Sequence, residues 1–330
     1  MYATGNKKML NMLILEILKE YTDEDHSLTQ QEIIKLLDKN YGMECDRRSV
    51  KNNILYLKEL GYDISSEKGY RLLSRDFEDA ELRMMIDSVL FSKSLSAKQA
   101  KGLVEKIRSL GSRYFSAKVS HICNLPELQH SDNKQVLYVL DTINEAIDKH
   151  KKISFTYNNY GTDFKLHARK EEKYVVNPFQ LVANNGRYYL IGNYDKYDNI
   201  SHYRIDRMTD VSIIDLPRKP SKEIIGLEKG LNLPKHMAEH IYMFSGSSTD
   251  IIMFAEKHLM SEMVDWFGKD FTILEENNDL LKIRVSLNEN AAYYWALQYG
   301  PYVEIIEPVT LRKRLSEDIR SMAGKYDSCD

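Results

Sequence analysis

The chain has 330 residues, with 46 lysines and arginines against 49 aspartates and glutamates, so its formal net charge at pH 7 is -3. This length predicts two or three domains, and the balanced charge means that any surface for nucleic acid must be local. Three cysteines without CxxC spacing exclude a disulfide-framework protein and a cysteine-based zinc site. With no signal peptide and no membrane-length apolar run, we expect a cytoplasmic protein that does not contact a membrane.

The first 75 residues are predicted to form three short helices followed by a two-stranded hairpin. Apolar residues from Leu10 to Tyr21 recur at helical spacing and indicate the first helix. A second helix starts at Thr29, whose spacing to Glu32 is that of a capping box. Asp46 is positioned to cap a third helix, and a glycine-containing hairpin follows at residues 64–72. These elements in this order are typical of a winged helix-turn-helix domain, which we assign to residues 1–75.

The third predicted helix, residues 46–60, has a basic outer face. From Arg47 to Lys58 it holds four basic residues and no acidic one. Arginine and asparagine can bond base edges, and lysine and serine can bond phosphates, so this composition suits a recognition helix. The alternative is an ordinary solvated helix face, but the following hairpin favours DNA binding. The candidate DNA-binding residues are Arg47, Arg48, Ser49, Lys51, Asn52 and Tyr56 on the helix, with Lys68 and Arg71 on the hairpin.

Residues 76–150 are predicted to be a helical connector. Helical periodicity covers Glu81–Phe91, Ala97–Leu110 and Gln135–His150. Between the second and third of these helices, residues 111–132 show no regular pattern and contain a proline, so we predict an irregular segment there.

The second half of the chain is predicted to hold two domains rich in strands. In residues 151–216 the apolar period changes to two, and Asn184-Asn185-Gly186 is a strong hairpin signal, so we expect a small, bent antiparallel barrel. One of its strands is predicted over Tyr203–Ile214. Residues 217–330 show the order strand, helix, strand, strand, helix, strand, which is typical of a ferredoxin-like domain. The predicted fold class is therefore α+β and multidomain.

Several short motifs in this half resemble the WYL domain family. They are Ile153–Tyr157, Asn177–Leu181, Gly186–Gly192 and Tyr203–Met208, in the family's order; the name-giving Trp-Tyr-Leu stands here as Tyr188-Tyr189-Leu190. The resemblance implies that residues 151–216 form an Sm-like β-barrel, which binds an anionic ligand such as a nucleotide or single-stranded nucleic acid. It also implies that residues 217–330 are the C-terminal extension of such proteins, and that a winged helix upstream fits the family layout.

The ligand positions of the family map onto Tyr157, His202, Arg204 and Arg207. Arginine offers a planar donor fork to phosphate, and tyrosine can stack on a base. On one continuous strand, however, Arg204 and Arg207 would point to opposite faces, so a bulge or a strand end is needed to bring both into one pocket. The alternative is a structural ion pair between Asp206 and one of the arginines.

Two other classes of function compete with this interpretation. His236, Glu239 and His240 match the inverted zinc-protease pattern HxxEH, but no third ligand is evident and a chance match is the simpler explanation. An accessory protein that binds RNA or single-stranded DNA is the second alternative. Since other catalytic patterns are missing, we predict no enzyme activity, no catalytic residue, no cofactor and no metal. The predicted function is a ligand-responsive transcriptional regulator that binds duplex DNA as a homodimer.

Overall fold

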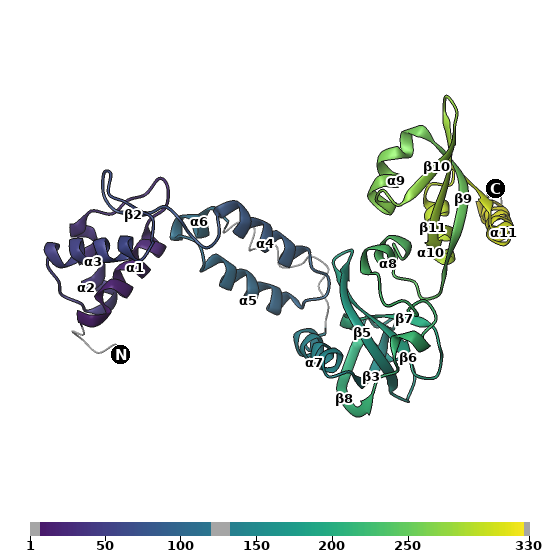
Figure 1. The fold of residues 1–330 in the computed structure, drawn as a ribbon, viewed down its shortest axis with the longest axis horizontal. Helices are drawn as coiled ribbons and strands as arrows, with labels where there is room; N and C mark the ends of the chain where they lie inside the picture. Colours follow the sequence, from purple (N-terminus) through teal and green to yellow (C-terminus); the bar gives the residue numbers. More distant parts are fainter. Residues whose placement is uncertain (1–6, 120–132, 327–330) are drawn as a thin grey trace. The chain divides into compact units, whose positions relative to one another are not determined.

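The computed structural model describes residues 7–119 and 133–326, and these divide between two compact units, Met1–Lys134 and Gln135–Asp330 (Figure 1). Both helices and strands are abundant, which confirms the predicted α+β class. No helix within the described ranges is long and apolar enough to cross a bilayer.

The first unit begins with the three predicted helices and the hairpin. The elements are a 3-10 turn η1 (Lys7–Met9), α1 (Leu10–Tyr21), α2 (Gln30–Tyr41), α3 (Arg47–Glu59), β1 (Ile64–Ser65) and β2 (Arg71–Leu72). Thr29 and Glu32 form the predicted capping box of α2, and the Asp46 side chain accepts a hydrogen bond from the Ser49 N–H at the start of α3. Ile64 pairs with Leu72 in the antiparallel hairpin.

One apolar core joins these elements. Ile14 of α1, Ile33 of α2, Ile54 of α3 and the hairpin residues Ile64 and Leu72 all belong to it, and each is at most 3% exposed. Because α3 buries its apolar side in this core, its opposite side faces solvent. The hairpin is held against the helices by the same core, so its turn has a fixed place beside α3.

Three further helices complete this unit: α4 (Asp79–Phe91), α5 (Ala97–Arg108) and α6 (Arg113–Lys118). The prediction of an irregular segment over residues 111–132 is wrong at its start, where α6 lies. Ser112 caps this short helix by accepting from the Phe115 N–H, and Phe115 packs against Leu82 and Ile86 of α4. Because α6 has only 6 residues, its sequence is too short to show a helical period. The rest of that segment, residues 120–132, lies outside the described residues.

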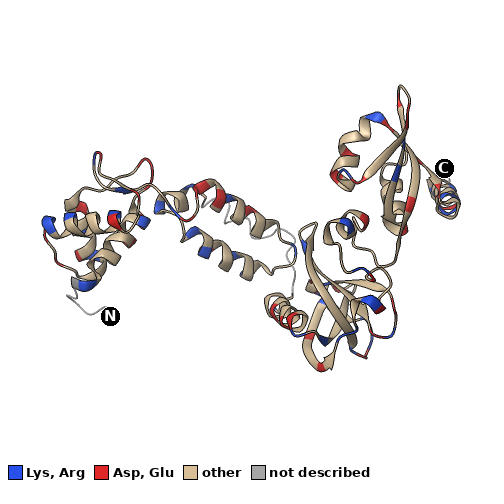
Figure 2. Cartoon of the chain, viewed as in Figure 1, with Lys and Arg blue, Asp and Glu red and all other residues tan. Residues whose placement is uncertain are grey.

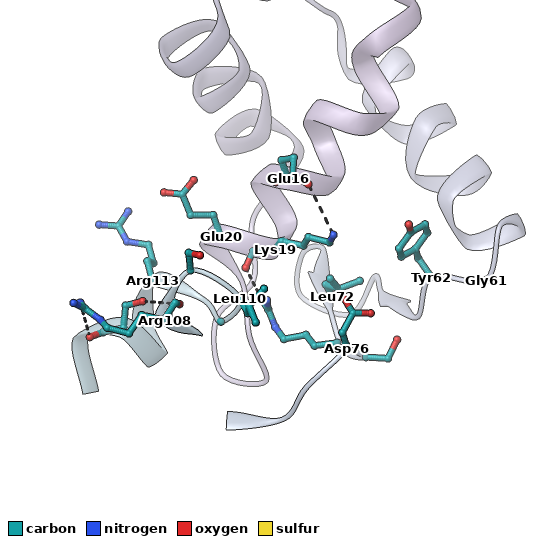
Figure 3. Close-up of a pocket in the computed structure, with 15 residues that line it drawn as sticks. Glu16, Lys19, Glu20, Gly61, Tyr62, Leu72, Asp76, Arg108, Leu110 and Arg113 are labelled. Carbon is teal, nitrogen blue, oxygen red and sulfur yellow. Dashed lines mark hydrogen bonds and ion pairs between the residues drawn. The ribbon is translucent and has the colours of Figure 1, made fainter. Parts of the chain in front are cut away.

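A cavity of about 840 Å³ lies in the first unit where residues of α1 approach those of α5 and α6 (Figure 3). Its lining mixes acidic and basic side chains. Arg75 donates from Nη2 to the carbonyl oxygens of Lys19 and Thr22, at 2.7 and 2.6 Å, at the C-terminal end of α1. Arg108 bonds Glu105 and the carbonyl of Ser116. These guanidinium groups are already used to join elements, so we do not take this cavity as a ligand site.

Replacing Arg75 with alanine should lower the free energy of unfolding of the first unit by about 1–3 kcal/mol, because two carbonyls at the end of α1 lose a charged donor. Urea-induced unfolding followed by circular dichroism measures this. Arg83→Ala is the control, since Arg83 and Asp87 form an exposed pair that should contribute at most about 1 kcal/mol. Equal stability of the two variants would show that Arg75 does not hold α1 in place.

The second unit begins with α7 (Val136–Asp148), which packs on the sheet that follows. Val139 and Ile143 are fully buried against Ile153 and Phe155 of the first sheet strand. We predicted this helix as part of the connector ending at residue 150, whereas the division between the compact units falls after Lys134. The apolar face of α7 accounts for the difference, because the sheet is its packing partner.

A curled antiparallel sheet follows α7. Its strands are β3 (Lys151–Tyr160), β4 (Leu166–Ala168), β5 (Tyr174–Asn184), β6 (Arg187–Tyr194), β7 (Ile200–Arg204) and β8 (Met208–Pro217), in the order β4-β3-β5-β6-β7, with β8 also paired to β3. The predicted hairpin is present: Asn184 pairs with Arg187, and Asn185 and Gly186 both have positive φ. The single strand predicted over Tyr203–Ile214 is wrong, because a 3-10 turn, η2 (Ile205–Arg207), divides it. This turn buries Ile205 and Asp206.

The remainder of this unit starts with a 3-10 turn and the short helix α8 and then forms a second antiparallel sheet. The elements are η3 (Ser221–Glu223), α8 (Leu233–Glu239), β9 (Ser248–Glu256), η4 (Lys257–Leu259), α9 (Met260–Phe267), β10 (Phe271–Glu276), β11 (Leu280–Asn288), α10 (Glu289–Gln298), β12 (Val303–Glu307) and α11 (Val309–Tyr326). The strand order is β10-β11-β9-β12. From β9 to β12 the elements follow the predicted order, and Trp295 and Phe267 are fully buried between helices and sheet.

Candidate functional site

The solvent side of α3 carries basic and amide side chains. Figure 2 colours the lysines and arginines of the chain blue. The exposed predicted residues on this helix are Arg47, Arg48, Lys51, Asn52 and Tyr56. Ser49 is half-buried, and its carbonyl accepts a hydrogen bond from the Asn53 side chain. Arg47 and Arg48 occupy the first two helical positions. The helix therefore presents guanidinium, ammonium and amide donors on one surface, as the sequence predicts.

The two candidate residues on the hairpin differ in their surroundings. Lys68 is exposed at the turn, where its φ is 56° and its carbonyl accepts a hydrogen bond from the Ser27 hydroxyl. Arg71 is half-buried and donates from Nη1 to the carbonyl of Glu24 at 2.6 Å. The Arg71 guanidinium is thus used within the fold, whereas the Lys68 side chain extends from the tip of the hairpin.

A cavity of about 670 Å³ opens on the curled sheet and is lined by basic and aromatic side chains. It contains three of the four predicted ligand residues, Tyr157, His202 and Arg207. The sequence did not single out the other members: Arg169, Lys170 and Lys196 with Tyr174, Tyr194, Tyr197, Tyr203, Asn159, Asn199, Ser201 and Ser245. No aspartate or glutamate is among the described residues of this lining. Such a cavity is suited to an anion that carries a planar ring.

Arg207 lines this cavity because β7 ends at Arg204 and the chain then forms the η2 turn, which redirects the Arg207 side chain. A continuous strand would have directed Arg207 away from His202, so the turn resolves the conflict in strand phase that the sequence raised. The Arg207 Nε is buried and finds no hydrogen-bond partner among the described residues. Tyr157 is also buried, which raises the pKa of its hydroxyl, and that hydroxyl accepts a hydrogen bond from the Arg204 N–H. A buried donor without a partner is costly unless a ligand accepts from it.

Arg204 is directed away from the cavity and onto Asp206. Its Nε and Nη2 lie 3.1 and 2.6 Å from the two carboxylate oxygens of Asp206, which is 1% exposed. Arg187 bonds the same carboxylate at 3.2 Å. The alternative that the sequence left open, a structural ion pair with Asp206, is the arrangement seen for Arg204.

Arg204→Ala should lower the free energy of unfolding of the second unit by about 1–3 kcal/mol, because a buried carboxylate loses two charged hydrogen bonds. Lys257→Ala is the matched control: its pair with Glu276 is exposed and should contribute at most about 1 kcal/mol. Thermal and urea unfolding provide the measurement. If Arg204→Ala instead keeps full stability and loses ligand binding, Arg204 is a ligand residue.

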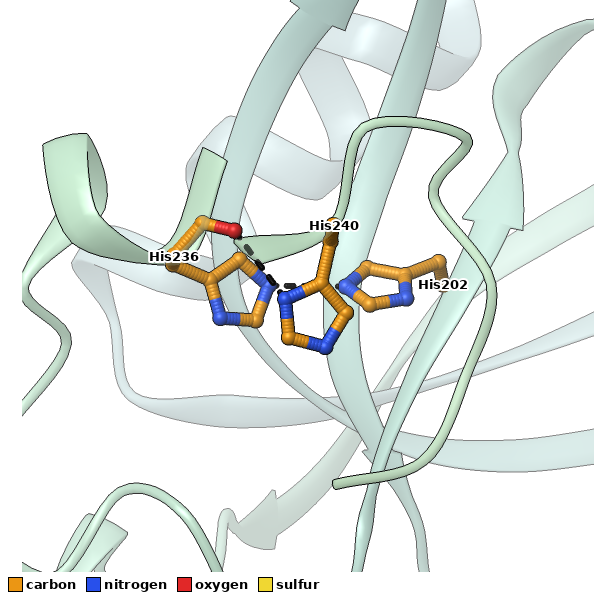
Figure 4. Close-up of side chains that lie close together, drawn as sticks. All are labelled: His202, His236 and His240. Carbon is orange, nitrogen blue, oxygen red and sulfur yellow. Dashed lines mark hydrogen bonds between the residues drawn. The ribbon is translucent and has the colours of Figure 1, made fainter. Parts of the chain in front are cut away.

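His202 also contacts two histidines of the HxxEH pattern (Figure 4). Its Nε2 lies 2.8 Å from the Nε2 of His236, and the rings of His236 and His240 stack with centroids 4.1 Å apart. Burial, and then the charges of His240 and His236, lower the pKa of His202 to about 3. Burial and His240 lower the pKa of His236 to about 4. His202 and His236 are therefore uncharged near pH 7. Oε1 of Glu239, the acidic member of the pattern, lies 3.7 Å from Nζ of Lys235, with which it forms an ion pair.

Two family models match the chain. The WYL domain model matches residues 138–213, and the WCX domain model matches residues 255–323. Over 200 residues the chain is 22% identical to the "Uncharacterized HTH-type transcriptional regulator YobV" of Bacillus subtilis (strain 168). That alignment covers 60% of this chain and 58% of YobV, so the chain spans less than two thirds of this relative.

The solved structures that match the chain include two with TM-scores below 0.5. Proteasome accessory factor B/C of Arthrobacter aurescens is 13% identical, with a TM-score of 0.34, over 99% of this chain and 50% of that one. A CRISPR Cas-related protein is 14% identical, with a TM-score of 0.40, over 97% of this chain and 84% of that one.

Proposed function

We propose that this chain, which the WYL domain model matches over residues 138–213 and the WCX domain model over residues 255–323, is a DNA-binding transcriptional regulator that responds to an anionic ligand. The observation that carries the DNA-binding half is the outer face of α3. Five exposed polar or basic side chains lie there on a helix whose other face is fixed in a three-helix core next to a hairpin. The name of YobV, an HTH-type transcriptional regulator, supports the same function.

In this proposal α3 lies in the major groove of duplex DNA. Arg47 and Arg48 bond guanine edges, Asn52 bonds an adenine edge, and Lys51 contacts phosphate. The hydroxyl groups of Tyr56 and Ser49 contact the sugar-phosphate backbone of the DNA. From the hairpin, Lys68 contacts phosphate. We leave Arg71 out of the interface because its guanidinium bonds the Glu24 carbonyl.

The sensing half of the proposal rests on the basic cavity of the curled sheet. Arg207, Lys170 and Arg169 supply positive charge, and Tyr174 and Tyr194 supply rings. The Lys170 ammonium lies 4.0 Å from the centroid of the Tyr174 ring and donates to the Tyr194 hydroxyl, so the cations and rings form one surface. A nucleotide or a short single-stranded nucleic acid has phosphates that the cations can bind and bases that can stack on the rings.

We extend the proposal to the domain architecture and the assembly. Residues 1–75 form the winged helix-turn-helix, 151–216 an Sm-like barrel and 217–330 a ferredoxin-like extension. Residues 76–150 hold the connecting helices, of which the last, α7, packs on the barrel sheet. Two copies bind a two-fold symmetric operator, because one recognition helix covers only a few base pairs. Sedimentation equilibrium with and without operator tests the homodimer. A monomer bound to a single half-site would contradict it.

The experiment that tests the DNA-binding half compares two nucleic acids. Fluorescence anisotropy should show tighter binding to duplex DNA than to single-stranded RNA of the same sequence, with an affinity that falls as salt rises. Tighter binding to the RNA would favour the alternative, an accessory protein for single strands. For the sensing half, native mass spectrometry of protein purified from its host should reveal a co-purifying nucleotide or oligonucleotide.

A further inference from the structure

Three imidazoles, one from β7 and two from α8 and its C-terminal cap, point toward one another (Figure 4). His202 lies on β7, His236 lies on α8, and His240 caps the C-terminal end of α8. One nitrogen from each ring can be chosen so that all three lie within 4.8 Å of one another. We propose that His202, His236 and His240 form a binding site for one divalent transition-metal ion, with zinc as the reference metal.

One pair of ring nitrogens has nearly the spacing that two ligands of one metal require, and the ring nitrogens of all three histidines lie within 4.8 Å of one another. The Nε2 atoms of His202 and His236 lie 2.8 Å apart. Nitrogen ligands at about 2.0–2.1 Å from a tetrahedral zinc ion are about 3.3 Å from each other. If the proton of this hydrogen bond moves from Nε2 of His236 to its Nδ1, a small rotation of either ring replaces the histidine–histidine hydrogen bond by two metal bonds.

A main-chain carbonyl orients the His202 ring as carbonyls do in metal sites, whereas His240 has a carbonyl oxygen near each ring nitrogen. Nδ1 of His202 lies 3.1 Å from the Phe244 carbonyl, so a proton on Nδ1 leaves the Nε2 lone pair toward the cluster. His240 has carbonyl oxygens near both nitrogens, of His236 at 3.0 Å and of Gly246 at 3.2 Å. A neutral imidazole can donate only one proton, so only one of these two contacts is a hydrogen bond. At the other contact the lone pair of a His240 nitrogen faces the lone pairs of a carbonyl oxygen, and the two repel each other. A cation bound at that nitrogen removes the repulsion.

The surroundings give the site both support and access. An apolar cluster that includes Ile191 and Ile200 from the curled sheet and Ile224, Leu227 and Met243 from the following segment holds α8 next to β7. His236 and His240 line a cavity of about 1040 Å³, which provides an entry path for an ion.

The proposed role is binding and not hydrolysis. Glu239, which would act as the base in the HxxEH pattern, pairs with Lys235 and is not part of the three-histidine cluster. A bound ion would join β7 to α8 and so connect the curled sheet to the segment that leads into the second sheet. His202 also lines the basic cavity, so the ion would lie beside the proposed anion site.

The test uses the full chain stripped of metal with a chelator. Titration calorimetry with zinc should show one ion per chain, and cobalt should give the visible absorption of a tetrahedral site. His202→Asn and the double variant His236→Asn, His240→Asn should each lose affinity by more than the roughly 10–100-fold that removal of an outer-shell partner causes. His258→Asn is the matched control, since His258 is exposed and pairs with Glu256; it should bind zinc as the unaltered chain does.

Three results would overturn the proposal: no stoichiometric zinc binding by the unaltered chain, unchanged affinity in the His202 and double variants, or an equal loss in His258→Asn. If a variant fails to fold, zinc-edge X-ray absorption of the unaltered, zinc-loaded protein decides. Three imidazole ligands support the site, and fewer contradict it. Zinc should also raise the melting temperature of the unaltered chain and of His258→Asn, because an ion that binds only the folded state stabilises it.

Discussion

Replacing Arg47 and Arg48 together with alanine should abolish specific binding to duplex DNA and leave the fold intact. Each bidentate arginine–guanine contact contributes about 1–3 kcal/mol, so loss of both should weaken binding by about 30-fold to 10⁴-fold. Both side chains are exposed and outside the apolar core, and such surface changes typically alter stability by less than about 0.5 kcal/mol. Fluorescence anisotropy on a selected duplex measures the affinity, and thermal unfolding measures the stability.

Lys39→Ala is the matched control for this experiment. Lys39 is exposed on α2 of the same domain, and its removal takes away a positive charge that does not belong to the α3 surface. It should change duplex affinity far less than the double arginine variant. If the two variants bind equally well, the assignment of α3 as the recognition helix is wrong.

Arg207→Ala should remove binding of the anionic ligand without lowering stability. Truncating one partner of a buried charged pair costs about 2–5 kcal/mol of affinity, which is about 30-fold to 5000-fold. Because the buried Nε of Arg207 finds no partner among the described residues, its removal should leave the free energy of unfolding unchanged or raise it. Titration calorimetry with the co-purifying anion, and with a nucleoside diphosphate as a reference probe, measures the affinity.

Two comparisons make the Arg207 result specific. Lys222→Ala removes an exposed positive charge outside the cavity and should keep the ligand affinity. Arg204→Ala is the second comparison. Because Arg204 has a structural role, its replacement should lower the free energy of unfolding, whereas replacement of Arg207 should not. If Arg207→Ala unfolds the second unit, or binds the anion as the unaltered chain does, the assignment of the cavity as the sensor site fails.

Local sequence signals predicted most of the secondary structure. The capping residues Thr29 and Asp46 mark the starts of α2 and α3, and Asn185-Gly186 marks the turn between β5 and β6. These signals work because a cap or a positive-φ turn depends on residues only a few positions apart. The η2 turn was missed because part of its support is not local: the buried Asp206 pairs with Arg187, which lies on another strand, as well as with Arg204.

The candidate sites were predictable to different extents. Helical periodicity alone separates the exposed face of α3 from its buried face, so its basic residues could be named from sequence. The basic cavity could not, because Arg169 and Lys196 lie outside the named strands and approach Arg207 only when the sheet curls. His202 lies 34 residues before His236, so nothing in the HxxEH pattern indicates it as a third ligand.

The central claim is that α3 binds a defined duplex DNA sequence. Selection from a pool of random duplexes, with the unaltered chain and the Arg47→Ala, Arg48→Ala double variant in parallel, tests it most directly. We predict that the unaltered chain enriches one motif with two symmetric half-sites and that the double variant enriches none. Enrichment of the same motif by both proteins, or of no motif by either, would contradict the claim.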